Sequence, residues 1–333
     1  MIADLIRKAA DGLDLTSEEA KAAMTEIMSG QASPVQIASF LVAMRMKGET
    51  SEEVTEFARV MRQHVRSVSP RARPLVDTCG TGGDAIKTFN VSTCAALVAA
   101  GAGVAIAKHG NRSVTSKCGS ADVLEALGIR FDLSPEEAAQ CIDNIGLGFM
   151  FAPSYHPAMK YAAPVRRELG LRTMFNMLGP LTNPAGADAQ VLGVYSPELT
   201  ELHASVLRNL GSQRAYVVHG VGGLDELSTF GETRVTELKE GEMRTYNVKP
   251  EDFGLERAAP EDLQGRTPEV NAQLLVDILG GREGPARDIV LLNAAAAIAA
   301  GGKADTLSEG LAVAADSVTS GAARSTLEAL QAF

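Results

Sequence analysis

The sequence predicts an α/β protein: a small N-terminal helical domain followed by a large α/β domain with a mostly parallel central sheet. The first 68 residues contain only helical patterns with start and stop signals, whereas from residue 75 onward short β-like runs alternate with helices. The segment RSVSPRARP at 66–74, with two prolines and three arginines, is expected to be a linker. We therefore expect a boundary that divides residues 1–70 from residues 71–333.

Local signals place the first helices. Thr16 followed by Glu19 is the pattern of a capping box, in which two side chains satisfy free backbone N–H groups at a helix start. Ser33–Pro34 places a capping serine before a proline in the first helical turn. Thr50 or Ser51 is expected to cap the next helix. The N-terminal region is thus predicted to be entirely helical.

The larger region alternates between the two kinds of element. Its β-like runs are at 75–77, 104–107, 147–152, 189–195 and 215–220. Helices are expected to begin near Asn90, Ser120, Ser134, Pro197 and Gly223. This order predicts a parallel sheet covered by helices. The run 234–248, turning at Glu240–Gly241, predicts a hairpin at an antiparallel edge.

The overall composition limits the classes of ligand. The net charge is −10, and aromatic residues make up only 5% of the chain, with no Trp. An acidic chain disfavours binding to nucleic acid or to an anionic membrane, and few rings are available to stack on bases. We therefore expect neither a nucleic-acid partner nor a membrane, and an anionic ligand must be bound by a local group of cations and N–H donors.

The cysteines and the apolar runs indicate the compartment. Cys79, Cys94, Cys118 and Cys141 include no C-x-x-C pair, so their spacing predicts neither a zinc site nor a disulfide framework. The N-terminus is amphipathic and does not resemble a signal peptide. The longest apolar run, 94–107, is too short to span a bilayer. These features favour a cytoplasmic protein.

A glycine-rich loop follows the first predicted strand. The sequence GTGGD at 80–84 leads into Thr88, Asn90, Ser92 and Thr93 at the start of a predicted helix. Glycines let backbone N–H groups approach an anion closely, and a helix N-terminus adds free N–H groups and a partial positive charge. Because the loop is neither a P-loop nor a dinucleotide fingerprint, a tight turn and a phosphate site are both open at this point.

The loop after the second strand favours the phosphate site. The sequence KHGNRSVTSKCGS at 108–120 is rich in hydrogen-bond donors. Residues 85–121 contain four Lys or Arg but no Asp or Glu, although the chain has 41 acidic residues in 333. The carboxyl ends of parallel strands lie at one edge of a sheet, so the two loops are expected to meet there. Together they predict a site for a phosphate group.

Two further features suggest ligand groups. Arg166 and Arg167 lie in a predicted helix after the third strand, and because adjacent side chains point about 100° apart, at most one can face a pocket. An arginine there could clamp a carboxylate through two parallel hydrogen bonds, or the pair could form a solvated basic face. Asp225 and Glu226 follow the fifth strand and could bind Mg²⁺ or could be acids favoured at a helix N-terminus.

Four motifs together resemble those of the anthranilate phosphoribosyltransferase family. They are GTGGD with KTFNVST, KHGNRSVTSKCGSADVLEALG, HPAMKYAAPVRRELGLRTMFNMLGPLTNP and VHGVGGLDELS, and the similarity extends from about residue 5 to the C-terminus. The resemblance implies transfer of the phosphoribosyl group of 5-phosphoribosyl 1-pyrophosphate (PRPP) to the amine of anthranilate, in tryptophan biosynthesis. It also implies the fold of nucleoside phosphorylases and phosphoribosyltransferases, a homodimer, and a helical domain that takes in helices from about 155–185.

The resemblance also implies roles for individual residues. Mg²⁺ would be bound by Ser92, Asp225 and Glu226. Anthranilate would contact Gly80, His109, Asn111, His156 and Arg166, the last through its carboxylate. PRPP would be held by Gly80, Gly83, Asp84, Thr88, Asn90, Val91, Ser92, Thr93, Lys108, His109, Gly110, Asn111, Arg112, Ser113, Val114, Thr115, Ser116 and Ser120. No general acid or base is assigned, and Lys108 and Arg166 would act electrostatically.

Two other functions remain open from the sequence. A pyrimidine nucleoside phosphorylase of the same fold also uses a glycine-rich loop and a cationic loop. It needs one inorganic phosphate, however, and gains nothing from a metal at Asp225–Glu226 or from a carboxylate clamp at Arg166. A non-catalytic relative that binds nucleic acid would be expected to carry a basic surface stripe, whereas the net charge is −10.

Overall fold

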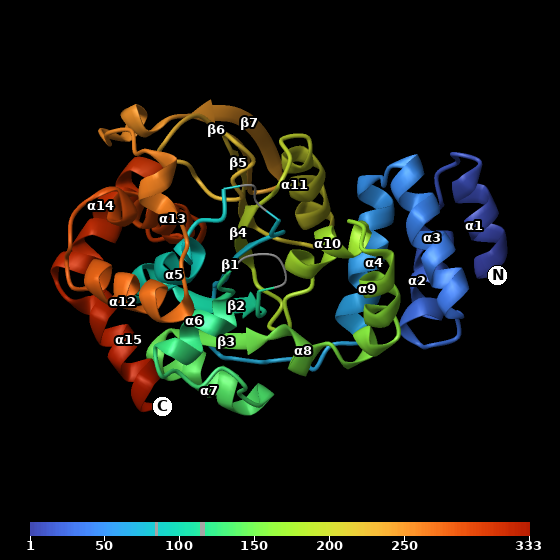
Figure 1. Cartoon of the computed structure of the whole chain (residues 1–333), viewed down its shortest axis with the longest axis horizontal. Coiled ribbons are helices and arrows are strands. Elements are labelled where there is room, and N and C mark those ends of the chain that lie inside the picture. Colours follow the sequence, from blue (N-terminus) through green and yellow to red (C-terminus); the bar gives the residue numbers. More distant parts are fainter. Residues whose placement is uncertain (84–85, 114–116) are drawn as a thin grey trace.

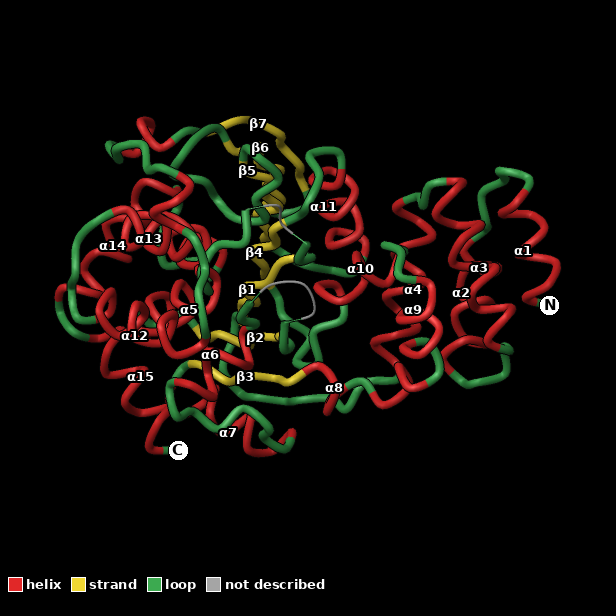
Figure 2. Tube along the Cα trace, viewed as in Figure 1, coloured by secondary structure: helices red, strands yellow, loops and turns green. Residues whose placement is uncertain are grey.

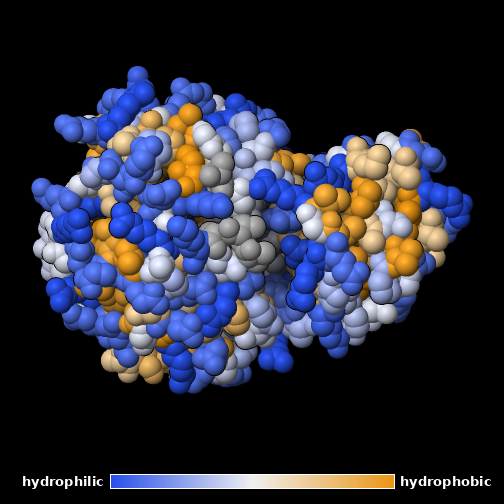
Figure 3. Space-filling view, in the orientation of Figure 1, coloured by the Kyte–Doolittle hydropathy of each residue, from blue (hydrophilic) through white to orange (hydrophobic). Residues whose placement is uncertain are grey.

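The chain forms two lobes of unequal size. The computed structural model describes residues 1–83, 86–113 and 117–333. Figure 1 shows a smaller helical lobe that contains the N-terminus and a larger lobe built around a central sheet. In the space-filling view the two lobes are joined through a narrower waist (Figure 3). In the part of the chain that the structure describes, no helix has the length and apolar character needed to cross a membrane.

Four N-terminal helices form most of the smaller lobe. They are α1 (Ile2–Ala10), α2 (Ser17–Met28), α3 (Pro34–Lys47) and α4 (Ser51–Gln63). The predicted helix starts are confirmed: Thr16 and Glu19 form a reciprocal capping box at α2. Ser33 caps α3 ahead of its first-turn proline, and Thr50 caps α4.

Two short helices from the middle of the chain, α9 (Ala163–Leu169) and α10 (Met174–Leu178), lie beside this lobe, with 3₁₀ turns at Pro157–Lys160 and Gly179–Leu181. The helix that precedes them, α8 (Ala152–Tyr155), packs against the third strand of the larger lobe, and its Tyr155 belongs to the core of that lobe. Helices α9 and α10 pack against α3, and α10 also packs against α4. Their buried side chains, such as Met174, join Phe40 in an apolar cluster that continues onto Leu192 and Val217 of the sheet.

In the described part of the chain, seven strands form one sheet. They are β1 (Leu75–Gly80), β2 (Ala105–Gly110), β3 (Leu147–Phe151), β4 (Ala189–Gly193), β5 (Arg214–Gly220), β6 (Thr233–Lys239) and β7 (Glu242–Val248). Their order is β3-β2-β1-β4-β5-β6-β7, parallel through β5 and antiparallel at β6 and β7. The predicted sheet and its edge hairpin are confirmed, and Glu240 and Gly241 both have the positive φ of a tight hairpin turn.

Helices cover both faces of the sheet. They are α5 (Val91–Gly101), α6 (Ser120–Ala126), α7 (Pro135–Ile145), α11 (Leu199–Asn209), α12 (Pro268–Leu279), α13 (Pro285–Ala300), α14 (Leu307–Thr319) and α15 (Ala322–Ala332), with 3₁₀ turns at Pro250–Phe253 and Pro260–Leu263. Figure 2 shows α11 on the side of the sheet that faces the smaller lobe and α5, α13 and α14 on the other side. Helices α5 and α13 pack directly against each other and against β1.

One predicted helix is wrong. The segment after β5 was expected to begin a helix near Gly223, but residues 221–228 form turns and irregular backbone. Gly222 and Gly223 have φ of 75° and 82°, which a right-handed helix does not allow. The turn has a consequence for the site, because it brings Asp225 and Glu226 back toward the ends of β1 and β4.

Candidate active site

One buried lysine joins the two predicted anion loops. Lys108 lies on β2 and is 2% exposed. Its ammonium donates to the carbonyl and the hydroxyl (3.4 Å) of Thr78 on β1, and to the hydroxyl of Ser92 (3.3 Å) in the first turn of α5. Burial lowers the pKa of Lys108, and Asp77, among other groups, opposes that effect. The geometry therefore holds a cation beside the N-terminus of α5, where negative charge would be stabilised.

The two acidic residues after β5 face the same helix N-terminus. The Gly82 N–H donates to Asp225 Oδ2 (3.0 Å), and the Ser92 N–H donates to Glu226 Oε1 (3.2 Å). Glycine at two strand ends makes room for them. A Cβ at Gly80 would lie 3.1 Å from Asp225 Cγ, and one at Gly193 would overlap the Asp225 carbonyl group.

These groups fit a hard divalent cation. Two carboxylates and the Ser92 hydroxyl are oxygen donors, the ligand type that Mg²⁺ prefers. Among residues 1–83, 86–113 and 117–333, no three His, Cys, Asp or Glu side chains gather into a metal cluster. Because Mg²⁺ usually keeps several waters and binds substrate phosphates, two carboxylates and a hydroxyl are sufficient protein ligands for it.

Asn90 links the first loop to the second. Its side chain does not cap α5. Instead its Nδ2 donates to the Cys118 carbonyl (3.2 Å) and its Oδ1 accepts from Asn271 Nδ2 (3.0 Å). Asn271 is buried at the start of α12 and also accepts from the Arg266 N–H (2.9 Å). Asn271 was missed at the sequence level, because a single polar residue 181 positions from its partner has no local pattern.

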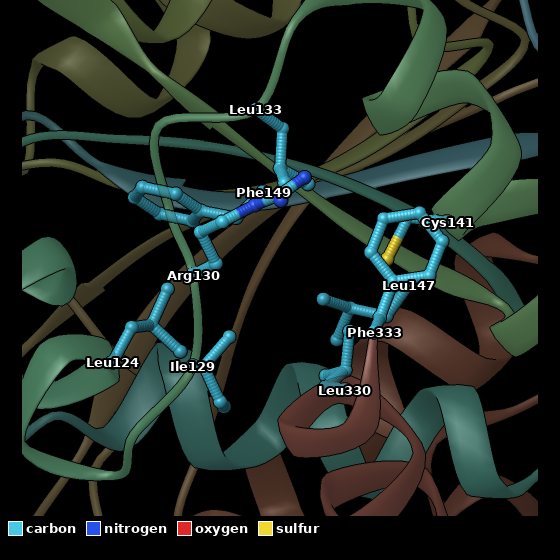
Figure 4. A pocket seen from close by; sticks show the side chains of 9 residues that line it. All are labelled: Leu124, Ile129, Arg130, Leu133, Cys141, Leu147, Phe149, Leu330 and Phe333. Atoms are coloured by element: carbon cyan, nitrogen blue, oxygen red, sulfur yellow. The ribbon is translucent and has the colours of Figure 1, made fainter.

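A polar cavity lies beside this link. Its volume is about 210 Å³, and its cationic lining residues are Lys87, Lys117 and Arg266. Thr88, a predicted PRPP contact, also lines it and pairs with Gln264 in an isolated bridge. The cavity thus shares Thr88 with the predicted anion site. A second cavity, lined by apolar side chains around Phe149 and Phe333 and by Arg130, has a volume of only about 10 Å³ and is too small for a substrate (Figure 4).

Other predicted residues of the second loop hold it against α6. The guanidinium of Arg112 pairs with Asp122 (2.8 Å) and with a second acid of that helix. The Ser113 N–H donates to Asp122 Oδ2 (3.0 Å), and Ser120 Oγ donates to the Asn111 carbonyl (3.1 Å). Arg112 is thus neutralised locally.

The remaining predicted PRPP contacts fall into two groups. Val91 and Thr93 are buried in the first turn of α5, and Gly110 ends β2. Four predicted contacts lie outside the described residues: Asp84, Val114, Thr115 and Ser116.

Two histidines form a buried pair near the end of β2. The Nε2 atoms of His109 and His156 are 3.0 Å apart, and the backbone N–H of His109 donates to Asp77 Oδ1 (3.1 Å). Burial lowers the pKa of His109 to about 3, with His156 acting in the same direction, and burial lowers the pKa of His156 to about 4. Both rings are therefore neutral at pH 7 and contribute hydrogen bonds rather than positive charge.

Arg166 lies on the side of the smaller lobe. Its guanidinium stacks over the Phe175 ring at 5.2 Å, and the side chain is half-buried, whereas Arg167 is exposed. Burial lowers the pKa of Arg166. Within the described ranges, no hydrogen bond joins Arg166 to either anion loop. The structure thus brings Lys108 and Ser92 together with the predicted metal residues Asp225 and Glu226 but leaves the predicted carboxylate clamp on a separate element.

Arg172 connects the two lobes and was not singled out from the sequence. Its Nη2 donates to the Gly83 carbonyl (2.6 Å), and its guanidinium lies 4.4 Å from the centre of the Tyr195 ring. The Arg172 carbonyl accepts from Arg45 of α3. Arg172 lies in the same motif as Arg166, but nothing in the sequence distinguishes an arginine that links two lobes from one that faces solvent.

Comparison with known proteins defines the class. Residues 3–65 match the helical bundle domain of the glycosyl transferase family, and residues 72–324 match the α/β domain of that family. The fold and the anion loops therefore belong to a two-part glycosyl transferase.

The relatives define the particular family. Anthranilate phosphoribosyltransferase from Symbiobacterium thermophilum is 57% identical over 330 residues, which are 99% of this chain and 96% of the relative. The crystal structure of the Thermus thermophilus enzyme has a TM-score of 0.93 and 49% identity over 98% of each chain. The Saccharomyces cerevisiae enzyme in complex with PRPP and Mg has a TM-score of 0.89 and 31% identity, covering 98% of this chain and 96% of that one. This chain belongs to the anthranilate phosphoribosyltransferases of tryptophan biosynthesis, as its motifs predicted.

Proposed function

We propose that this protein transfers the phosphoribosyl group of PRPP to the amine of anthranilate, giving N-(5-phosphoribosyl)anthranilate and pyrophosphate. The observation that carries the proposal is the cluster at the N-terminus of α5. There the Lys108 ammonium donates to Ser92, and the Ser92 N–H donates to Glu226. Breaking the bond between the ribose C1 and pyrophosphate develops negative charge on the leaving group, and this cluster is suited to stabilise it.

The predicted metal residues are part of the proposal. Asp225, Glu226 and Ser92 would hold Mg²⁺, which neutralises charge on the departing pyrophosphate when it is bound. The complex of the yeast relative with PRPP and Mg supports the use of this metal. The chain's own contribution is to keep these three oxygen donors beside Lys108 and beside the N–H groups of the glycine loop.

Anthranilate is assigned to the residues on the other side of the site. Arg166 would pair with its carboxylate, and Asn111 and Gly80 would contact the ring and the amine. His109 and His156 are neutral and would line the pocket as hydrogen-bonding groups. The amine can lose its proton after attack on C1, so no side chain is assigned as a general base. Catalysis in this proposal consists of positioning and charge stabilisation.

The domain division, the homodimer and the cytoplasmic location are also proposals. Residues 1–70, with helices from about 155–185, would form one domain and residues 71–333 the other. A homodimer is supported by exposed apolar side chains on the smaller lobe, such as Val35 (75%) and Met46 (82%). Figure 3 shows apolar residues gathered on this lobe. Light scattering during size exclusion tests the dimer, and a monomer at micromolar concentration would contradict it.

One assay tests the activity. The purified protein with PRPP, Mg²⁺ and anthranilate should consume the fluorescence of anthranilate, because the product loses it. No turnover, combined with phosphorolysis of thymidine or uridine, would identify a pyrimidine nucleoside phosphorylase instead. Salt-dependent retention on DNA without transferase activity would indicate the nucleic-acid-binding alternative.

A further inference from the structure

Asn293 is a polar residue inside an apolar helix. From Ile289 to Ala300 all side chains of α13 are buried, and all except that of Asn293 are apolar; Asn293 is 2% exposed. Burying an amide is unfavourable unless its donors and its acceptor are paired. The groups that pair with Asn293 therefore explain its position.

The Asn293 amide binds the backbone of Leu227 at two points. The Leu227 N–H donates to Asn293 Oδ1 (2.9 Å), and Asn293 Nδ2 donates to the Leu227 carbonyl (2.9 Å). The second N–H of the amide donates to the Ile289 carbonyl (2.8 Å), one turn back on α13. This pattern fixes the orientation of the amide. In the reversed orientation the amide NH₂ would face the Leu227 N–H, and the amide oxygen would face the Leu227 carbonyl. In the described chain the Leu227 backbone forms no hydrogen bond to the backbone of a strand or helix. The Asn293 side chain supplies these hydrogen bonds instead.

Leu227 directly follows the acidic pair. At the other end of this short segment, Gly220 and Leu224 exchange backbone hydrogen bonds of 2.8 and 3.1 Å. Asp225 and Glu226 thus lie between two anchors, one at the end of β5 and one on α13. Helix α13 also packs against α5, whose first turn carries Ser92. The three predicted metal residues are therefore fixed to one pair of packed helices.

We propose that Asn293 is a positioning residue that sets the place of Asp225 and Glu226 relative to Ser92, and through them the affinity of the metal site. The inference rests on the proposed role of these residues in binding Mg²⁺. Asn293 acts only through the Leu227 backbone. Groups that orient metal ligands change metal affinity by about 10- to 100-fold when they are removed.

Two uncharged substitutions test the role. Asn293→Leu keeps the branched shape of the side chain, with methyl groups in place of the amide oxygen and nitrogen, and removes all three hydrogen bonds. Asn293→Ser is smaller and keeps one hydroxyl that can still form a hydrogen bond. Binding of Mn²⁺ is measured by electron paramagnetic resonance with PRPP present and anthranilate absent, so that no turnover occurs. We expect Mn²⁺ affinity to fall by about 10-fold or more in Asn293→Leu and by less in Asn293→Ser. The KM for anthranilate at saturating Mg²⁺ and PRPP should stay within about twofold. If Asn293→Leu does not fold, Asn293→Ser alone decides.

A matched control separates positioning from general stability. Ser317 is buried on α14 and donates to the Val98 carbonyl of α5 (2.8 Å), so Ser317→Ala also removes a buried contact to α5. It should lower the melting temperature and leave Mn²⁺ affinity unchanged. The inference is overturned if both Asn293 variants bind Mn²⁺ within twofold of wild type, or if Ser317→Ala weakens Mn²⁺ binding equally.

A second reference variant distinguishes this inference from the function on which it rests. Asp225→Asn combined with Glu226→Gln removes both carboxylates and should abolish Mn²⁺ binding. If the double variant loses the metal while the Asn293 variants retain it, the positioning role is wrong and the metal site stands. If the double variant binds Mn²⁺ as wild type does, the metal assignment and the inference both fail.

Discussion

The end of β4 offers a test of how closely the acidic pair must approach the sheet. A Cβ at Gly193 would overlap the Asp225 carbonyl and would lie 2.9 Å from Asp225 Cα. Ordinary contacts of a Cβ are 3.4 Å or longer, so restoring one requires the Cβ and Asp225 Cα to separate by about 3.4 − 2.9 = 0.5 Å, and the Asp225 carbonyl by more. The obstructing atoms belong to the backbone, so no change of rotamer relieves the overlap.

Gly193→Ala should therefore displace the Asp225 carboxylate from the N-terminus of α5. A misplacement on the order of 1 Å in a catalytic site costs about 100-fold in rate, which corresponds to about 2.7 kcal/mol of transition-state stabilisation. We expect kcat/KM to fall by about that factor, and half-maximal activity to require more Mg²⁺. The assay follows the loss of anthranilate fluorescence over a series of Mg²⁺ concentrations, with the melting temperature measured in parallel.

Gly148→Ala is the matched control. A Cβ at Gly148 on β3 would lie 2.6 Å from Ile142 Cγ1 and 2.7 Å from the Ala138 carbonyl, which are contacts with α7. This substitution should lower stability without changing the Mg²⁺ requirement. The reasoning is refuted if Gly193→Ala keeps kcat/KM within threefold of wild type with an unchanged Mg²⁺ dependence. A Gly148→Ala variant with the same shift in Mg²⁺ dependence would refute it as well.

Three further predictions concern other parts of the site. Arg166→Ala should raise the KM for anthranilate at least about 10-fold through loss of a charge-assisted pair and leave the KM for PRPP nearly unchanged, and an unchanged anthranilate KM would contradict the clamp. Asn271→Ala should raise the KM for PRPP several-fold with little effect on anthranilate, because Asn90 loses its partner, and steady-state kinetics with either substrate varied would expose the opposite pattern. The pKa values of His109 and His156, about 3 and about 4, lie below the ordinary value of 6.5, so the unfolded chain takes up protons that the folded protein does not. Their contribution to stability is complete above pH 6.5 and is lost as the pH falls toward 4, by about 2 kcal/mol for each histidine at pH 5. In urea unfolding at pH 7.5 and 5.0, His156→Asn should lose less stability than wild type, and an equal loss would show that His156 is not the titrating group.

Elements with local signals were predictable from the sequence. The Thr16–Glu19 capping box and the capping Ser33 ahead of Pro34 act within one helical turn, so short-range sequence determines where α2 and α3 begin. The two anion loops were also predictable, because a high glycine content and an absence of acidic residues can be seen in a contiguous stretch of sequence. Parallel topology then implied that the loops meet, and Lys108 and Ser92 do meet.

The contacts that tie the site together were not predictable in this way. Asn271 lies 181 residues from Asn90, Asn293 lies 66 residues from Leu227, and Arg172 lies 89 residues from Gly83. Each is a single polar residue without a repeating pattern, and only the folded topology brings it to its partner. The wrong helix at Gly223 has a different cause, since the acidic pair suggested a helix start while two glycines with positive φ made a turn.

The position of the glycine loop depends on the smaller lobe as well as on the sheet. Gly83 has a φ of 80°, a left-handed conformation that favours glycine, and Arg172 Nη2 lies 2.5 Å from where a Cβ would stand. Arg172 in turn is held by Arg45 of α3, in the lobe against which the Arg166 helix packs. The glycine loop is therefore held by the smaller lobe through one side chain, Arg172. The proposed acceptor clamp and the proposed donor loop thus contact the same lobe, because the helix of Arg166 packs against α3, which carries Arg45.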